Sequence, residues 1–202
     1  GAKLLHVRSK KIMAISNPVL FLAADRELAE EAWAGDIIGI PNHGTLRVGD
    51  TLTEGEHLHF TGIPNFAPEI LKRVRLDDPM RTKQLRRALE DLAEEGVSQI
   101  LRPVIGANWI VGVVGQLQLD VLAARLATEY KVSAGFEGAP FESARWIIGG
   151  KLMVKRFVES HRAALALDRD DAPVFLARNS WDLERTTREW PDLEFLAVKE
   201  RA

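Results

Sequence analysis

The chain contains no cysteine among its 202 residues. That absence excludes a disulfide framework, a thiolate zinc site and a cysteine nucleophile, and it fits the reducing cytosol. The longest apolar run, residues 17–24, is far shorter than the roughly 20 residues that a membrane span requires. The start of the chain has no signal-peptide pattern. We therefore expect a cytoplasmic protein without redox chemistry.

An excess of charge of one sign is also lacking. With 27 basic and 29 acidic residues, the formal net charge is −2, so the overall composition does not indicate nucleic-acid binding. Hydrophobic residues make up 46% of the chain, which is enough to form a core. A length of 202 residues lies between one large domain and two small ones, and we expect two.

The N-terminal third is rich in short β-type runs. Over residues 3–66 these runs are separated by glycine- and asparagine-containing turns, which predicts an all-β segment. The stretch IPNHGTLRVGDTL, with Asn42, His43 and Asp50, could form a catalytic loop. Tight turns explain the same residues without catalysis. Apolar and polar residues alternate over residues 45–48, which favours a strand there.

The pattern changes at residues 64–68, where IPNFAP precedes strands that alternate with amphipathic helices. We place the domain boundary in this segment. It separates a β domain, residues 1–66, from an α+β domain, residues 67–202. The predicted interdomain linker consists of Pro64, Asn65, Phe66 and Pro68.

The second domain repeats one order of elements. Residues 69–137 predict strand, helix, strand, strand, helix, strand, with helices near 80–95 and 116–131, and residues 142–199 repeat this order more faintly. The βαββαβ order is that of the ferredoxin-like unit, in which both helices cover one face of a four-stranded antiparallel sheet. The predicted fold class is therefore α+β. Periodicity leaves open whether the tandem units share one core or fold separately.

Several patterns that resemble functional motifs have simpler interpretations. The GGK triplet at residues 149–151 lacks the earlier glycine and the following Ser or Thr of a phosphate-binding loop, so a strand-to-helix turn is favoured. His57 and His59 share a face of a predicted strand, but the nearby sequence offers no third metal ligand. His161 continues an apolar helix face, which favours a packed histidine over a general base. We expect no catalytic residue and no metal site.

Residues 72–87 carry an unusual charge pattern, with seven basic residues against two acids. The predicted helix in this region has its basic residues at the N-terminal end and acids at the C-terminal end. This placement is unfavourable for the helix dipole and costs roughly 0.3–1 kcal/mol of helix stability per charge. A solvated face explains the run, and so does a surface that docks on phosphate or on an acidic partner. The candidate contact residues are Arg73, Arg75, Arg81, Lys83, Arg86 and Arg87.

Several longer runs resemble a known family. GDIIGIPNHGTLRVGDTLTEGE, FTGIPNFAPEI, GVVGQLQLDVLAARLATEY and SWDLERTTREWPDLEF are similar to the second and third domains of the bacterial peptide chain release factor three family. The resemblance covers essentially the whole chain after Gly1 and Ala2. The first run resembles the β-barrel of domain 2 in translational GTPases. Near the end, Trp190-Pro191-Asp192 is similar to the corresponding segment of the release factor family rather than to that of the elongation factor.

The resemblance implies a GTPase that binds the ribosome after peptide release and promotes the departure and recycling of the stop-codon-reading release factor. The phosphate loop, switch segments and guanine-specificity motif of that family belong to an N-terminal domain, and none of them occurs in these 202 residues. We therefore expect a C-terminal fragment without its own cofactor, whereas GTP and Mg²⁺ would bind in the N-terminal domain. The first barrel strands should also be missing, which would leave an incomplete antiparallel barrel.

The implied partners are small-subunit rRNA and proteins together with the stop-codon-reading release factor, with no DNA and no membrane. The six basic candidates would contact rRNA. Two other classes stay open: an elongation-type or ribosomal protection factor with the same two domains, and a free-standing module of tandem ferredoxin-like units that binds a small molecule. An independent enzyme would need a cluster of nucleophile, base and orienting group, and the sequence shows no motif for one.

Overall fold

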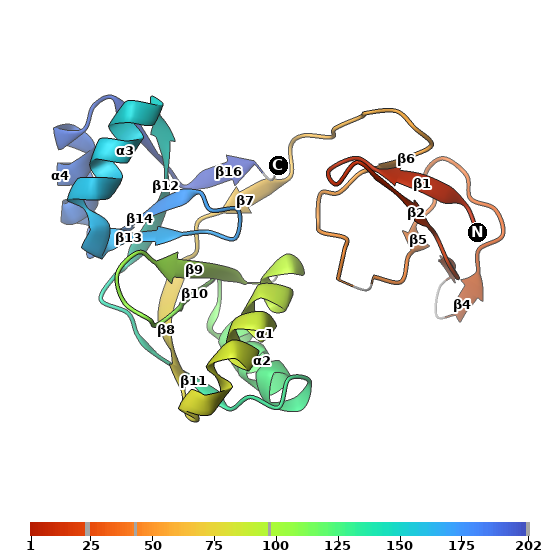
Figure 1. The fold of residues 1–202 in the computed structure, drawn as a ribbon, viewed down its shortest axis with the longest axis horizontal. Helices are drawn as coiled ribbons and strands as arrows, with labels where there is room; N and C mark the ends of the chain where they lie inside the picture. The colour runs from red at the N-terminus through yellow and green to blue at the C-terminus, as the bar shows by residue number, and fades with distance from the viewer. Residues whose placement is uncertain (23–24, 43, 97, 201–202) are drawn as a thin grey trace. The chain divides into compact units, whose positions relative to one another are not determined.

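The computed structural model describes residues 1–22, 25–42, 44–96 and 98–200. The chain divides into two compact units (Figure 1). The first is Gly1–Gly62, and the second begins at Ile63. The division therefore falls just before the predicted linker.

Short antiparallel sheets form the regular structure of the first unit. One sheet has the order β2-β1-β6, built from β1 (Lys3–His6), β2 (Lys11–Ala14) and β6 (Leu52–Thr53). The other has the order β4-β3-β5, built from β3 (Val19–Leu22), β4 (Asp25–Leu28) and β5 (Ile38–Gly39). Within the described residues, no strand pairing joins these two sheets. The incomplete barrel stays a prediction.

Two strands expected in the first unit do not form. Residues 45–48 and 57–63, all within the described part of the chain, have no strand assignment, so these predictions are wrong. In the first of these segments, the backbone N–H groups of Thr45 and Leu46 donate to the side chain of Asn42. An amide side chain thus replaces the neighbouring strand that the alternating pattern suggested.

Strands and helices alternate in the second unit. Its first half contains β8 (Ile70–Leu76), η1 (Pro79–Arg81), α1 (Thr82–Glu94), β9 (Gln99–Pro103), β10 (Ile110–Val113), α2 (Gln116–Thr128) and β11 (Ala134–Gly138). Its second half contains β12 (Ser143–Gly149), α3 (Lys151–Ser160), η2 (Arg162–Ala164), β13 (Leu165–Leu167), β14 (Pro173–Ala177), α4 (Ser180–Glu189) and β15 (Leu193–Leu196). In addition, β7 (Pro64–Phe66) and β16 (Val198–Glu200) form a two-stranded antiparallel sheet. The expected mixture of helices and antiparallel sheet is confirmed.

One eight-stranded sheet runs through both halves, in the order β11-β8-β10-β9-β13-β14-β12-β15. Each pair of neighbours in it is antiparallel. The halves join where β9 pairs with β13, through Ala166 opposite Pro103 and Leu167 opposite Arg102 (Figure 1). The order in one half is therefore the reverse of the order in the other.

Helix α1 shows how the sequence specifies this architecture. Its buried residues Leu85, Ala88, Leu89 and Leu92 recur at spacings of three and four, which places them on one face of a helix. The Asp78 side chain accepts a hydrogen bond from the N–H of Met80 at 3.0 Å and so caps the turn that leads into α1. The apolar face then packs on the first half of the sheet.

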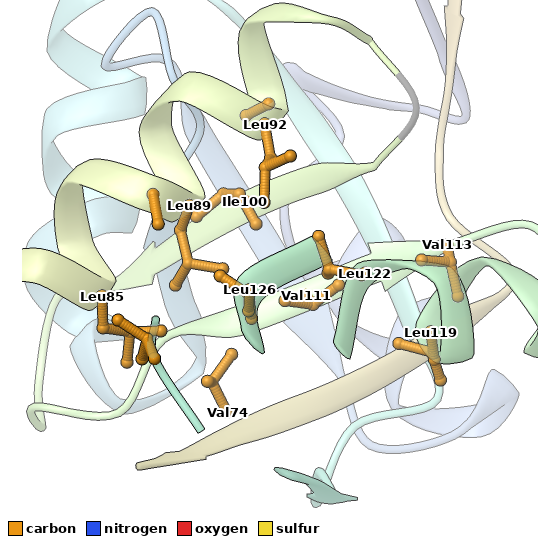
Figure 2. Packing of buried hydrophobic residues seen from close by; sticks show 13 residues of the cluster. Val74, Leu85, Leu89, Leu92, Ile100, Val111, Val113, Leu119, Leu122 and Leu126 are labelled. Carbon is orange, nitrogen blue, oxygen red and sulfur yellow. The ribbon is translucent and has the colours of Figure 1, made fainter. Parts of the chain in front are cut away.

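Three clusters of buried apolar residues hold the second unit together. The first lies between α1, α2 and the strands of the first half, with Leu89, Val111 and Leu126 among its fully buried members (Figure 2). The second lies between α3, α4 and the strands of the second half, around Phe157 and Phe175. Each half therefore has its own core on its helix-covered face.

The third cluster belongs to both halves. Leu71, Leu101 and Ile110 come from the first half, and they pack with Trp146 and Leu176 from the second. These residues alternate along their strands with the members of the helix-side clusters, so they lie on the helix-free faces. The two halves thus share one core on those faces, which answers the question that periodicity left open.

Candidate functional site

The exposed side of α1 carries the largest group of basic candidates. Arg81 lies at the end of η1, and Lys83, Arg86 and Arg87 lie on α1, all exposed. The three residues on α1 lie outside its buried leucine face. The first turn of α1 contains no acidic residue, so the positive charge at this end of the helix dipole stays unfavourable, as the sequence predicts.

Acidic neighbours partly compensate the charge on α1. Arg86 Nε lies 3.0 Å from Glu90, and Arg87 Nε lies 3.9 Å from Asp91. Arg81 Nε lies 3.4 Å from Asp78, and Arg81 also donates to the carbonyl of Lys131. Exposed pairs of this kind contribute roughly 0–1 kcal/mol. They could therefore be exchanged for contacts with phosphate at little cost.

The two strand candidates lie on the other side of the sheet. On β8, Val74 faces the core beneath α1 and α2, whereas Leu71 belongs to the shared core of the helix-free faces. Arg73 and Arg75 have the same parity as Leu71 and so point away from the two helices. The structure therefore brings Arg73 and Arg75 together, but it does not bring them together with the basic residues of α1.

Arg73 and Arg75 also differ in their contacts. Arg75 is paired with Asp77 at 3.3 Å and with Glu137 at 3.2 Å. Arg73 is partly buried and lines a hollow of about 240 Å³ with Phe141 and Ile105. Among the described residues, no acidic side chain forms an ion pair with Arg73.

The predicted linker is an anchored part of the second unit. Pro64, Asn65 and Phe66 form β7, which pairs with β16. Gln99 Nε2 donates to Asn65 Oδ1 at 3.1 Å and also to the carbonyl of Phe66. Pro68 is buried against Gly112, where an added Cβ would lie only 2.5 Å from Pro68 Cγ. These four residues therefore follow the division between the units.

The stretch IPNHGTLRVGDTL is organised by two polar side chains. Asn42 Oδ1 accepts the N–H groups of Gly44, Thr45 and Leu46 at 3.0–3.1 Å, and Asn42 Nδ2 donates to the Leu46 carbonyl. Asp50 accepts the N–H of Arg47 at 2.7 Å. Both side chains thus act as turn formers. His43 lies outside the described residues.

Asp50 also anchors the start of the chain. Arg8 donates to both carboxylate oxygens, at 2.6 and 2.9 Å, and His6 Nε2 lies 2.8 Å from Oδ2. Burial alone would raise the pKa of Asp50, but the hydrogen bonds from Arg8, from the N–H of Arg47 and from His6 outweigh burial and lower the pKa to about 2. This cluster ties β1 to the loop before β6.

Other motif-like residues are packed. Gly149 lies against Leu193, and Gly150 is the N-cap of α3, so the GGK triplet forms a strand-to-helix turn. His161 stacks on Phe157 with ring centroids 4.2 Å apart. His57 and His59 are exposed. Among the described residues, no three His, Cys, Asp or Glu side chains are grouped as metal ligands would be, and no helix in the same ranges could span a bilayer.

Sequence reasoning missed a buried carboxylate. Asp168 accepts Trp146 Nε1 at 2.9 Å, Lys199 Nζ at 3.1 Å and the N–H groups of Asp170 and Ala172. Asp168 lies in the loop after β13, and its hydrogen bonds connect this loop to β12 and to β16. These partners are far apart in the sequence and share no spacing rule, so no local signal identifies the contact.

The contacts that join the acidic C-terminal end of α1 to α2 were missed as well. Arg125 lies 2.7 Å from Glu129 and 3.0 Å from Glu95, and these hydrogen bonds raise the pKa of Arg125. Burial, together with Asp91, Glu129 and Glu95, raises the pKa of Tyr130. The i,i+4 spacing of Arg125 and Glu129 is visible in the sequence, but the link to Glu95 requires the packing of the two helices.

Comparisons with known families agree with the division into two units. Residues 1–55 match elongation factor G domain 2. Residues 60–187, more than half of the chain, match the family described as class II release factor RF3, C-terminal domain. The fold and the two matches define domains of a translational GTPase. The chain belongs to the class II release factor RF3 family through its C-terminal domain, which confirms the resemblance seen in the sequence. In general terms, such domains interact with the ribosome.

Proposed function

We propose that this chain supplies the ribosome-contacting domains of a factor that promotes departure of the stop-codon-reading release factor after peptide release. The observation that carries the proposal is the match of residues 60–187 to the class II release factor C-terminal domain. The elongation factor G domain 2 match over residues 1–55 supports the same order of domains as in a translational GTPase. In this proposal the chain acts in translation termination and is located in the cytoplasm.

In this proposal the two units contact the ribosome, whereas a separate N-terminal GTPase domain binds GTP and Mg²⁺ and hydrolyses the nucleotide. The first unit would be the translation-factor barrel. The second would be a tandem of ferredoxin-like units, supported by the strand order β11-β8-β10-β9 and its reversed counterpart β13-β14-β12-β15. Calorimetry with this chain and GTP should show no binding, and micromolar affinity would contradict the division of labour.

The basic side of α1 is the surface that we propose for contact with rRNA. Its cations are exposed, and the Arg87 side chain is 85% exposed. Arginine can donate two parallel hydrogen bonds to one phosphate. The charge opposes the helix dipole, so its placement does not serve the stability of α1. Arg73 and Arg75 lie on the opposite sheet face and would need a different part of the partner.

The experiment reverses Arg86 and Arg87 to Glu in the full-length factor. We expect weaker sedimentation with ribosomes, slower recycling of the stop-codon-reading release factor, and a salt dependence that flattens by roughly one unit per lost phosphate contact. Folding should be retained, since both side chains are exposed and their pairs with Glu90 and Asp91 contribute little. Lys155→Glu with Arg156→Glu is the matched control, because these adjacent residues are exposed on α3.

Equal losses in both double variants would indicate nonspecific attraction. Unchanged ribosome affinity with intact folding would identify the basic side of α1 as a solvated face. A full-length factor that accelerates translocation but not recycling would instead support the elongation-type alternative.

A further inference from the structure

The hollow beside Arg73 has an unusual combination of charge and apolar wall. Among the described residues, Arg73 alone contributes a charged side chain to its wall. The rest of the wall includes Phe141, Leu165 and Leu176, and its volume is about 240 Å³. Residues from both halves of the second unit contribute, since Leu165 and Leu176 belong to β13 and β14. The hollow lies on the helix-free side of β8, away from the basic side of α1.

The positive charge of Arg73 lacks a counter-charge in this hollow. Glu137 lies directly across from Arg73 on β11, but its carboxylate pairs with Arg75 at 3.2 Å. In the described residues no other acid forms an ion pair with Arg73. A partly buried guanidinium without a carboxylate gains more from an incoming anion than a solvated one does, because the local dielectric is lower.

The rim of the hollow favours an apolar contact next to that charge. The loop between β9 and β10 forms the rim, and Ile105 in this loop is 56% exposed. Gly106 has φ +103, a left-handed conformation that favours glycine, so the loop is shaped to project Ile105 at this point. Asn108 is a further polar group on the wall and can donate a hydrogen bond from its amide.

We propose that this hollow is a docking site for a short peptide segment of a protein partner that presents a carboxylate beside an apolar side chain. The carboxylate pairs with Arg73, and the apolar side chain packs on Ile105 and Phe141. Nucleic acid suits the site poorly, since backbone binding uses several cations and this wall has one. The volume is below the roughly 300–1,000 Å³ of small-molecule sites and fits one or two side chains. The proposal does not depend on rRNA contact by α1.

The test uses the intact chain, labelled with ¹⁵N, and the probe acetyl-Ala-Leu-Glu-Leu-Ala-amide. We expect saturable chemical-shift changes in the amides of residues 104–110, 139 and 141. The same peptide with Gln in place of Glu should bind at least about tenfold more weakly, because the charge-assisted pair is lost. Arg73→Gln should cause a similar loss. Lys72→Gln is the matched control, since Lys72 is a cation on the same strand but on the opposite face and does not line the hollow.

A second variant keeps the test decisive if Arg73→Gln fails to fold. Ile105→Ser changes an exposed rim residue and should weaken binding several-fold without loss of structure. The proposal is wrong if millimolar peptide leaves these amides unshifted, or if the Glu and Gln peptides bind equally. It is also wrong if Lys72→Gln reduces binding as much as Arg73→Gln does. Stronger binding of a uridine tetranucleotide or inorganic phosphate at the same amides would assign the hollow to nucleic acid instead.

Discussion

Gly112→Ala tests whether residues 64–68 are anchored in the second unit. A Cβ at Gly112 would lie 2.5 Å from Cγ and 2.7 Å from Cβ of Pro68, well inside van der Waals contact. Pro68 is buried and its ring is rigid, so it cannot rotate away. Gly112 itself is in β10 and is not among the glycines with positive φ. Backbone strain at Gly112 therefore does not enter the expected effect.

The two expectations differ in sign. If Pro68 is fixed, overpacking should destabilise the second unit by about 1–3 kcal/mol and lower its Tm by several degrees. If residues 64–68 formed a loose linker, the alanine would be neutral, or would stabilise by about 0.4–1 kcal/mol through the unfolded chain. Urea denaturation followed by tryptophan fluorescence measures the difference, because Trp109 and Trp146 lie in the second unit.

A double-mutant cycle shows whether the clash is the cause. Pro68→Gly removes the atoms that an alanine at residue 112 would meet, so the double variant should be more stable than the sum of the single effects predicts. Gly138→Ala is the matched control, because Gly138 is also in a strand and an added Cβ there meets no atom within 4 Å. A neutral or stabilising Gly112→Ala would refute the anchored arrangement.

Three further predictions follow from the polar contacts. The folded-state pKa of Asp50 is about 2 and its ordinary value is 3.8, so Asp50 stabilises the first unit by about 2 kcal/mol above pH 4. This contribution is lost as the pH falls through 2, and in Asp50→Asn the free energy of unfolding should depend less on pH in this range. Asp168→Ala should cost roughly 3 kcal/mol in urea denaturation, and Lys199→Met less, because Trp146 would keep its acceptor. Tyr130 is the one tyrosine of the chain, so its absorbance should titrate above pH 10, and higher still in Arg125→Gln; a midpoint that falls in this variant would contradict the assignment.

Periodicity could predict most of the second unit because its helices follow local rules. The spacing of Leu85, Leu89 and Leu92 specifies the buried face of α1, and Asp78 marks where its capping turn begins. Residues two apart on a strand share a face, so parity alone places Arg73 and Arg75 on one side of β8. The sequence could not show which elements cover the opposite face, because the contact of α1 and α2 with β8 depends on tertiary packing.

Nonlocal contacts account for the remaining differences. The pairing of β9 with β13 joins residues more than sixty positions apart, and no hairpin turn or helix cap marks it. In the first unit, Asn42 supplies hydrogen bonds that a strand partner would otherwise provide, so the alternation of residues 45–48 predicted the wrong structure. The ion pairs of Arg75 with Glu137 and of Arg125 with Glu95 likewise depend on tertiary packing, which periodicity does not describe.

The shared core on the helix-free faces limits how this protein can be divided. A cut in the connection between β11 and β12 would separate two halves that each keep most of a helix-side core. Each would also present to water a sheet face lined by residues such as Leu101 and Ile110, or Trp146 and Leu176. Exposed apolar faces of that kind promote association. Half-domains expressed alone should therefore pair again or aggregate, and a protein engineer who wants one half must first replace its inner face with polar residues.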